Sequence, residues 1–211
     1  MGHRTDQKDA SLQRILNASA ARLRREGLSG AAIAAVMREA GLTHGAFYCH
    51  FGNKEDLAIA ALRHALQDNR ARWVGSPRRE TWRDRLSRLG RRYLTSAHRD
   101  DVADSCALAA LVSDAARGGP AFKTAYQQET LKSLRAICAA TTTNDDGALN
   151  DDDTIEPARL DDAIAFLALC IGGLSLSRAV EDQAFSERIL DACRRAVSSL
   201  VAPRLPRHPS P

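Results

Sequence analysis

The 211-residue chain has few aromatic side chains, which make up 5% of it, and its five cysteines are scattered singly. Their odd number and wide spacing fit neither a disulfide framework nor the paired ligands of a zinc site. We therefore predict reduced cysteines that act as small buried hydrophobic residues, namely Cys49, Cys106, Cys138, Cys170 and Cys193.

Targeting and membrane signals are also missing. The N-terminus, MGHRTDQKDA, lacks the apolar core of a secretory signal, and no segment reads as long and apolar enough to span a bilayer. These absences predict a soluble cytoplasmic protein with no membrane partner.

The chain has no glycine-rich phosphate loop, no zinc-helix motif and no serine nucleophile elbow. Cys49 and His50 are adjacent, so on a helix they point about 100° apart and are poorly placed to share a proton. Four possible metal ligands lie near one another without the spacing of a known site: His98, Asp101, Asp104 and Cys106. We predict a protein that is not an enzyme and that holds no cofactor and no metal.

Charge is polarised along the chain, although the net charge is only +4. Residues 4–25 hold six Lys or Arg side chains against two acids, whereas residues 145–156 hold six acids and no base. A basic N-terminal element fits an anionic partner such as a phosphate backbone, but it fits an ordinary solvated helix face equally well.

Nearly every segment follows the 3.6-residue period of an α-helix, and none alternates as a strand does. A first helix carries an apolar stripe through Leu23 and ends at Gly27. Ser29 is placed to cap a second helix, which Gly41 ends. The remaining helices are expected at Trp82–His98, Ala103–Arg117, Phe122–Ala140, Ala158–Glu181 and Ala184–Val201. An acidic polar loop before Ala158 and a proline-rich tail are expected to be mobile.

Between these helices, residues 41–57 (GLTHGAFYCHFGNKEDL) gather many of the rings in the chain. Thr43 is placed to cap a short third helix through about Phe51, and Gly52 breaks it. Asn53 with Asp56 resembles a capping box that opens a fourth helix past Trp73. Two helices joined by a glycine-containing turn, the second one short, are typical of a helix-turn-helix that enters the DNA major groove.

Each unusual residue in this stretch has a role in such a motif. Phe47 and Phe51 are four residues apart, so they share a face that packs onto the preceding helices. The opposite face carries side chains that donate hydrogen bonds to phosphates or base edges, namely Thr43, His44, Tyr48 and His50. Gly45 permits close backbone approach. Lys54 adds a positive charge at the start of a helix, where free amides already favour an anion.

The pattern Thr-x-x-x-Phe-Tyr-x-His-Phe-x-x-Lys-x-x-Leu begins at Thr43 and ends at Leu57. It resembles the DNA-binding domain of the tetracycline-repressor (TetR) family of bacterial regulators, strongly over Leu12 to Leu62 and beyond that only in helix count. The resemblance implies a nine-helix homodimer on double-stranded operator DNA. It divides the chain into a helix-turn-helix domain (1–54), a helical effector-binding and dimerisation domain (55–202) and a disordered tail (203–211).

The resemblance also implies roles for single residues. Thr43 and Tyr48 would contact the groove and phosphates, and His44 would read bases. The other implied DNA contacts are Ser29, Gly45, His50 and Lys54. Cys49 departs from the pattern because it places a thiol beside the contact face, which leaves a cysteine-based redox sensor as the alternative to a ligand-released repressor.

The C-terminal domain is expected to hold the effector and the dimer contact. Rings that can line a cavity there are few: Tyr93, Phe122, Tyr126 and Phe166. Basic residues are scarce on the apolar faces of these helices, so we predict a neutral or cationic, largely apolar small molecule. The dimer candidates are Gly172, Gly173, Leu176, Ile189 and Cys193, on the last two helices.

Overall fold

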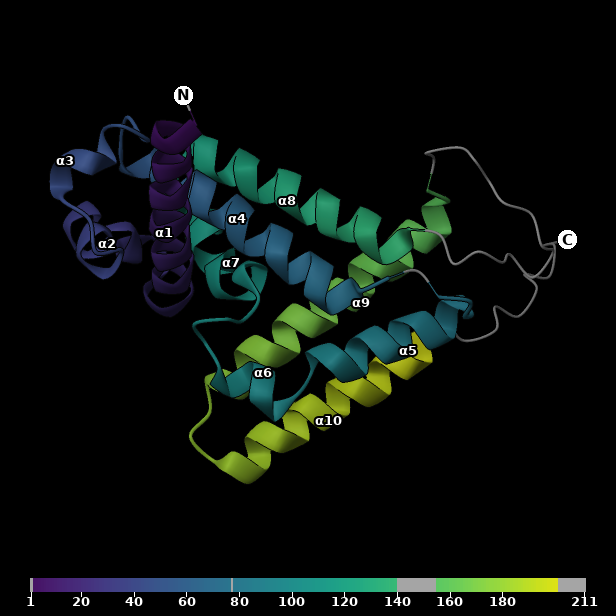
Figure 1. The fold of residues 1–211 in the computed structure, drawn as a ribbon. Coiled ribbons are helices and arrows are strands. Elements are labelled where there is room, and N and C mark those ends of the chain that lie inside the picture. Colours follow the sequence, from purple (N-terminus) through teal and green to yellow (C-terminus); the bar gives the residue numbers. More distant parts are fainter. Residues whose placement is uncertain (1, 77, 140–154, 201–211) are drawn as a thin grey trace, which may run out of the picture. The chain divides into compact units, whose positions relative to one another are not determined.

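The computed structural model describes residues 2–76, 78–139 and 155–200, and this described part contains helices and no strand. The predicted all-α fold is confirmed. The helices, labelled in Figure 1, are α1 (Gly2–Glu26), the 3-10 helix η1 (Gly27–Ala31), α2 (Ile33–Glu39), α3 (His44–Phe47), α4 (Lys54–Val74), α5 (Trp82–Tyr93), α6 (Ser96–Asp100), α7 (Ala107–Arg117), α8 (Pro120–Cys138), α9 (Pro157–Arg178) and α10 (Gln183–Leu200).

The chain packs as two compact units. Unit 1 comprises the described residues up to Gly75 together with Ala97 to Ser133, and unit 2 comprises Ser76 to Ser96 together with the described residues from Leu134 onwards. This division follows packing, and it differs from the functional boundary predicted after residue 54. That boundary concerns DNA contact and stays a prediction.

The predicted helix ends and caps in the first part of the chain are largely confirmed. Gly27 and Gly41 both have a φ of 65°, a left-handed conformation that suits glycine and ends the helices before them. Asn53 caps α4, because its side chain accepts a hydrogen bond from the Asp56 amide at 2.9 Å. Ser29 does not cap α2. It lies inside η1, and its hydroxyl donates to the Glu26 carbonyl at 2.5 Å.

Other helix boundaries differ from the prediction. The helix expected over Trp82–His98 breaks at Leu94, so that α5 and α6 replace one helix, and the described residues contain ten α-helices where nine were expected. The next helix begins at Ala107 and not at Ala103, and the amide of Cys106, its N-cap residue, donates to the His98 ring at 3.1 Å. The expected acidic loop lies mostly, and the expected tail entirely, outside the described residues.

In unit 1, α1 packs against α4 and α7. The Leu28 amide, just past the end of α1, donates to the Asp114 carboxylate of α7 at 3.2 Å. The fully buried Glu129 carboxylate of α8 lies 2.7 Å from Arg70 on α4. Lys132 of α8 also donates to this carboxylate at 2.7 Å, so two cations match its buried charge, and the bond from Arg70 ties α4 to α8.

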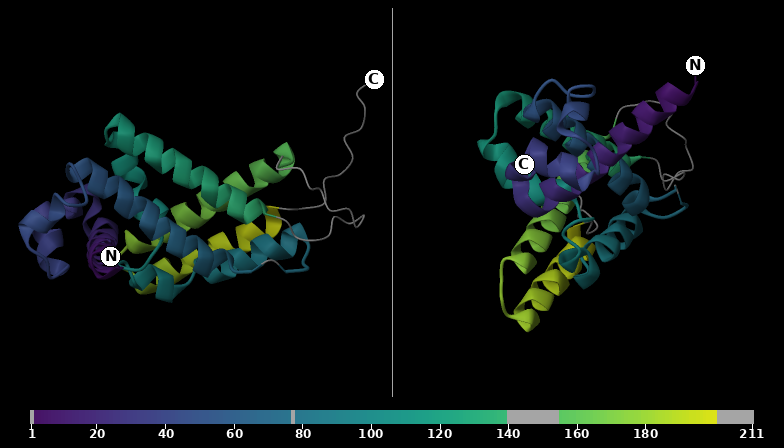
Figure 2. Two further views of the ribbon diagram at one scale, coloured as in Figure 1. Left: turned by 45° about the horizontal axis from the view of Figure 1, so that its top comes forward. Right: turned by 60° about the vertical axis from the view of Figure 1, so that its left-hand side comes forward.

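Unit 2 is built on α5, α9 and α10, which lie side by side (Figure 2). Phe166, Leu174 and Leu190 are fully buried there. By length and composition α9 could cross a membrane, contrary to the prediction from sequence. A core helix passes the same test, and in this fold the apolar residues of α9 form much of the core of unit 2.

Candidate nucleic-acid interface

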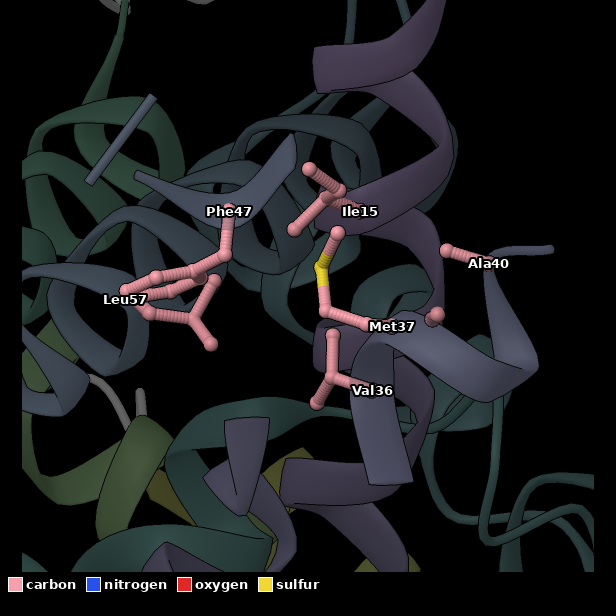
Figure 3. Close-up of a cluster of buried hydrophobic side chains, with 7 residues drawn as sticks. Ile15, Val36, Met37, Ala40, Phe47 and Leu57 are labelled. Atoms are coloured by element: carbon pink, nitrogen blue, oxygen red, sulfur yellow. The ribbon is translucent and has the colours of Figure 1, made fainter. Parts of the chain in front are cut away.

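Helix α3 is only four residues long and depends on one buried ring. Phe47 is fully buried, and it belongs to a cluster that includes Ile15 of α1, Val36 and Met37 of α2, and Leu57 of α4 (Figure 3). Its ring lies 5.7 Å from that of Phe51, which packs against the same cluster. So short a helix is marginal in isolation, so its position relies on this tertiary packing.

The opposite side of α3 faces solvent. Thr43, His44, Gly45 and Tyr48 are all exposed, and Tyr48 shows 64% of its surface. The rings of His44 and Tyr48 meet edge to face at 5.9 Å. A Cβ added to Gly45 would meet nothing within 4 Å, so a partner has room to approach the backbone there. These residues form one polar surface, as predicted.

The residues at the two ends of α3 differ from the prediction in their hydrogen bonding and conformation. Thr43 occupies the cap position with an extended backbone, but its side chain makes no capping hydrogen bond, contrary to the prediction. Its exposed hydroxyl is therefore not used to cap the helix. The helix ends at Phe47, and not near Phe51, so Cys49 and His50 lie in a turn. Cys49 is exposed, whereas the four other cysteines are buried or partly buried.

His50 is placed differently from the other predicted contacts. Its Nε2 lies 2.8 Å from the Ser11 hydroxyl of α1, and its ring is half-buried. Partial burial, together with the nearby Lys8, holds the pKa of His50 below its ordinary value, so the neutral ring is favoured. The imidazole thus braces the turn after α3 against α1. Ser11 was missed from sequence, although it lies one helical turn before the buried Ile15.

Lys54 is the first residue of α4 and is exposed. Glu55 and Asp56 share this first turn, so the local charge is mixed. The arginines of α1 are less available than the sequence suggested. Arg22 and Arg25 pair with Glu39 of α2, at 3.4 and 3.1 Å. The basic face of α1 is thus partly used in holding α1 to α2.

Of the predicted dimer residues, Gly173 lies inside the core of unit 2. A Cβ added there would come within 2.7 Å of the Cys193 sulfur, so Gly173 and Cys193 meet within one chain. A Cβ on Gly172 would meet nothing within 4 Å. Leu176 exposes 59% of its surface, and Ile189 is partly buried.

The predicted pocket residues fall in both units. Phe122 and Tyr126 belong to unit 1, and Tyr93 and Phe166 belong to unit 2. The Tyr126 hydroxyl donates to the Leu108 carbonyl at 2.8 Å, and the three other rings are buried. Two cavities of unit 1, of about 320 and 680 Å³, are lined by none of the four. A pocket at these rings stays a prediction.

Residues 15–61 match the family model described as bacterial regulatory proteins, tetR family. No curated protein sequence matches significantly. The solved structures that resemble the chain include a TetR-family transcriptional regulator from Cytophaga hutchinsonii, with 20% identity over 92% of this chain and 96% of that one and a TM-score of 0.68.

Two further structures are equally similar. A putative TetR-family transcriptional regulator from Rhodococcus sp. shares 22% identity, and the reduced form of NemR from E. coli shares 16%. Each alignment covers 92% of this chain and 100% of the other, with a TM-score of 0.68. At such low identity these likenesses show a common fold.

Proposed function

We propose that this chain, whose residues 15–61 match the tetR family model, is a TetR-family transcriptional regulator, and that it acts as a dimeric repressor that a small molecule releases from operator DNA. The exposed polar surface on α3 carries the proposal. Buried Phe47 holds the helix from behind, while His44 and Tyr48 face solvent in front. A buried aliphatic and aromatic anchor under an exposed hydrogen-bonding face is the arrangement that a major-groove helix needs.

Within this proposal the predicted contacts divide by chemistry. His44 reads base edges, since its ring is exposed on α3 itself. Thr43, Tyr48 and Lys54 contact phosphates or the groove edge, and Gly45 permits close approach. Ser29 is exposed and remains a candidate backbone contact. His50 acts through Ser11 and positions the turn, in place of the phosphate contact expected from sequence.

The chain is proposed to act as a homodimer in the cytoplasm. Leu176 of α9 and Phe185 of α10 expose 59% and 52% of their surfaces. They are the sequence neighbours of Ser177 and Ser186, whose side-chain to backbone hydrogen bond of 2.6 Å joins α9 to α10. A second copy that covers them would remove apolar surface from water and would supply a second α3 helix for the other operator half-site.

Selection from a random duplex library tests DNA binding directly. We expect enrichment of palindromes whose half-sites lie about 10 base pairs apart, centre to centre, because a two-fold dimer presents two identical helices. His44→Ala should relax base preference at one position of each half-site. Lys123→Ala, which removes an exposed lysine of α8, is the matched control and should change nothing. A library that shows no enrichment with the wild-type protein would refute the proposal.

Release by a ligand is the finer part of the proposal. A neutral or cationic apolar molecule that prefers one conformation of the helices around Tyr93, Phe122, Tyr126 or Phe166 would change the spacing of the two α3 helices in the dimer. The coupling free energy between ligand binding and operator binding would then be about 1–3 kcal/mol. Because the linkage is reciprocal, operator DNA must weaken binding of that ligand by the same factor. Titrating a molecule found by thermal-shift screening, with and without operator, measures this factor, and equal affinities would rule the molecule out as inducer.

A redox-sensing regulator is the second candidate, since Cys49 is exposed beside the polar surface of α3. Burial raises the pKa of Cys138 and Cys193, so these two thiols are protonated and less reactive at neutral pH. Hydrogen peroxide followed by a DNA-binding assay separates the candidates. If oxidation releases the wild-type protein but not Cys49→Ser, the thiol is the sensor, and no release supports the ligand mechanism.

A further inference from the structure

The larger cavity of unit 1, of about 680 Å³, is an open groove between α4 and α8, which run side by side (Figure 1). Side chains fix both of its ends. At the start of the two helices, a Cβ added to Gly119 would lie 3.2 Å from the Glu55 carboxylate. Two turns further on, Arg63 of α4 donates to the Gln128 side chain of α8 at 3.3 Å. The volume falls in the range of about 300–1,000 Å³ that small-molecule sites occupy.

The walls of this groove are largely apolar. Helix α4 contributes Ile59 and Ala60, and α8 contributes Ala121 and Ala125. The alanines leave room between the helices because each presents only a methyl group. Phe51, just before α4, adds its partly exposed ring at the end nearest α3. A ligand in this groove would therefore bury an apolar body against these side chains.

The two ends of the groove differ in charge. Asp56 and Arg63 both line it, and they lie on one face of α4 about 10 Å apart along the helix axis. The Asp56 carboxylate already accepts a hydrogen bond from the Asn53 side chain at 2.9 Å, at a helix start that favours negative charge.

Arg63 is the more available of the two groups. It is exposed, and its side chain bonds to the neutral amide of Gln128. Within the described part of the chain, no carboxylate pairs with its guanidinium. The end of the groove away from α3 can therefore bind an anion.

We propose that this groove binds a monocarboxylate with an apolar chain, with the carboxylate on Arg63 and the chain running along the alanines towards Phe51. A guanidinium binds a carboxylate through two parallel charge-assisted hydrogen bonds. An amine would have to compete with the helix cap for Asp56. A second carboxylate at the far end of the ligand would be repelled by Asp56 and Glu55.

Phe51 connects the groove to the polar surface of α3, because it packs against the buried cluster that contains Phe47. A chain lying on Phe51 would favour one position of this ring and change operator affinity. This consequence rests on the proposed function. Binding of the carboxylate does not, so it is tested without DNA.

Calorimetric titration of the full chain with n-alkanoates, from butanoate to decanoate, tests the site. We expect affinity to rise about three- to fourfold for each added methylene until the chain reaches Phe51, and then to level off. The n-alkanol and the α,ω-dicarboxylate of the best length should each bind at least about tenfold more weakly.

Arg63→Gln removes the charge and keeps a hydrogen-bonding side chain. It should weaken the best alkanoate at least about tenfold and leave the alkanol unchanged. Arg63→Lys, which keeps the charge but not the planar guanidinium, should recover part of the loss. Arg91→Gln, at an exposed arginine of α5, is the matched control and should change nothing.

Ala121→Leu is a second, steric test, because it fills the groove without changing a charge. It should abolish binding of alkanoate and alkanol alike, whereas Ala71→Leu, at an exposed alanine of α4 outside the groove, should not. Thermal unfolding checks that both variants keep the fold.

The proposal is overturned if no alkanoate binds at concentrations up to about 1 mM, or if alkanols bind as tightly as alkanoates. Wild-type affinity in Arg63→Gln or in Ala121→Leu would place the ligand elsewhere and overturn it equally. If alkanoates bind as expected but operator affinity is unchanged, the regulatory consequence is wrong and the site stands. If the wild-type protein binds no operator, the proposed function fails independently of the site.

Discussion

The chain exposes a ring at each of two surfaces, and the surroundings of the two rings differ. Tyr48, 64% exposed, has a hydroxyl and stands beside Thr43 and His44 in unit 1. Phe185, 52% exposed, has no polar atom on its ring and belongs to unit 2, as does the exposed Leu176. A polar surface is suited to a partner with phosphates and base edges, and an apolar one to a partner that removes it from water. This contrast is the reason we propose the first surface for DNA and the second for a protein partner.

The largest effect should come from breaking the support of the polar surface. Phe47→Ala deletes a fully buried ring and should lower the free energy of unfolding by about 3–5 kcal/mol. Tyr48→Ala, its neighbour, deletes an exposed ring and should change stability by no more than about 0.5 kcal/mol while weakening DNA binding. Urea denaturation and DNA titration measure the two quantities. Equal losses of stability in both variants would contradict the division between anchor and contact.

Charged substitutions at Leu176 and Phe185 test the apolar surface of unit 2. Covering the exposed halves of Leu176 and Phe185 stabilises a dimer by roughly 1 kcal/mol for each side chain. The double variant Leu176→Asp, Phe185→Asp should therefore sediment as a monomer and lose palindromic operator binding, while its helix content is unchanged. A variant that remains dimeric would place the interface elsewhere.

Gly172 and Gly173 separate core packing from surface packing. A Cβ on Gly173 would lie 2.7 Å from the Cys193 sulfur and 3.1 Å from Leu94, so Gly173→Leu should destabilise unit 2 by about 1–3 kcal/mol. Gly172→Ala meets no atom within 4 Å and should raise helix stability by up to about 1 kcal/mol. Thermal unfolding of both variants at several protein concentrations distinguishes chain stability from dimerisation. Gly173 was named from sequence as a dimer candidate, and because it packs inside unit 2 we expect its substitution to act on the fold.

Removing the positive charge of Lys54, beside the polar surface, should have a smaller effect on DNA binding. If the dimer makes about 6–10 phosphate contacts, operator affinity should fall about a thousandfold or more between about 50 and 200 mM salt. Lys54→Ala should weaken binding to all sequences alike and reduce the slope of log affinity against log salt by about 1 per subunit. Filter binding across a salt series measures the slope. An unchanged slope would remove Lys54 from the interface.

The smallest effect is the pH dependence of the His50 brace. Its folded pKa lies below the ordinary value of 6.5, so the unfolded chain takes up the proton first as pH falls. The contribution of His50 is fully present above that value and is lost as pH falls through the folded pKa. His50→Gln should flatten the fall in stability below neutral pH relative to the wild-type protein. Urea midpoints of the two proteins across this range measure the difference.

Local backbone conformation explains what the sequence determined by itself. Gly27 and Gly41 end their helices because glycine readily adopts a φ of 65°, and Asn53 caps α4 through an amide three residues away. The all-α fold and the motif around Phe47 follow from helical periodicity and short spacings, so they too were predictable. The prediction for Ser29 was wrong, because this residue lies inside η1, where its hydroxyl donates to the Glu26 carbonyl, and Ala32 occupies the position before α2.

Contacts between distant segments were decided only by the tertiary structure. His50 was predicted to face DNA and turns to Ser11, 39 residues away, because the turn after α3 packs on α1. Asp104 bonds to Arg72, 32 residues away, and also pairs with Arg24 at 3.7 Å, although nothing in the local sequence joins these three charges. Gly173 and Gly172 are adjacent, yet only one meets α10. In each case the partner depends on which faces of two helices meet, and a side chain's own neighbours in sequence do not specify that choice.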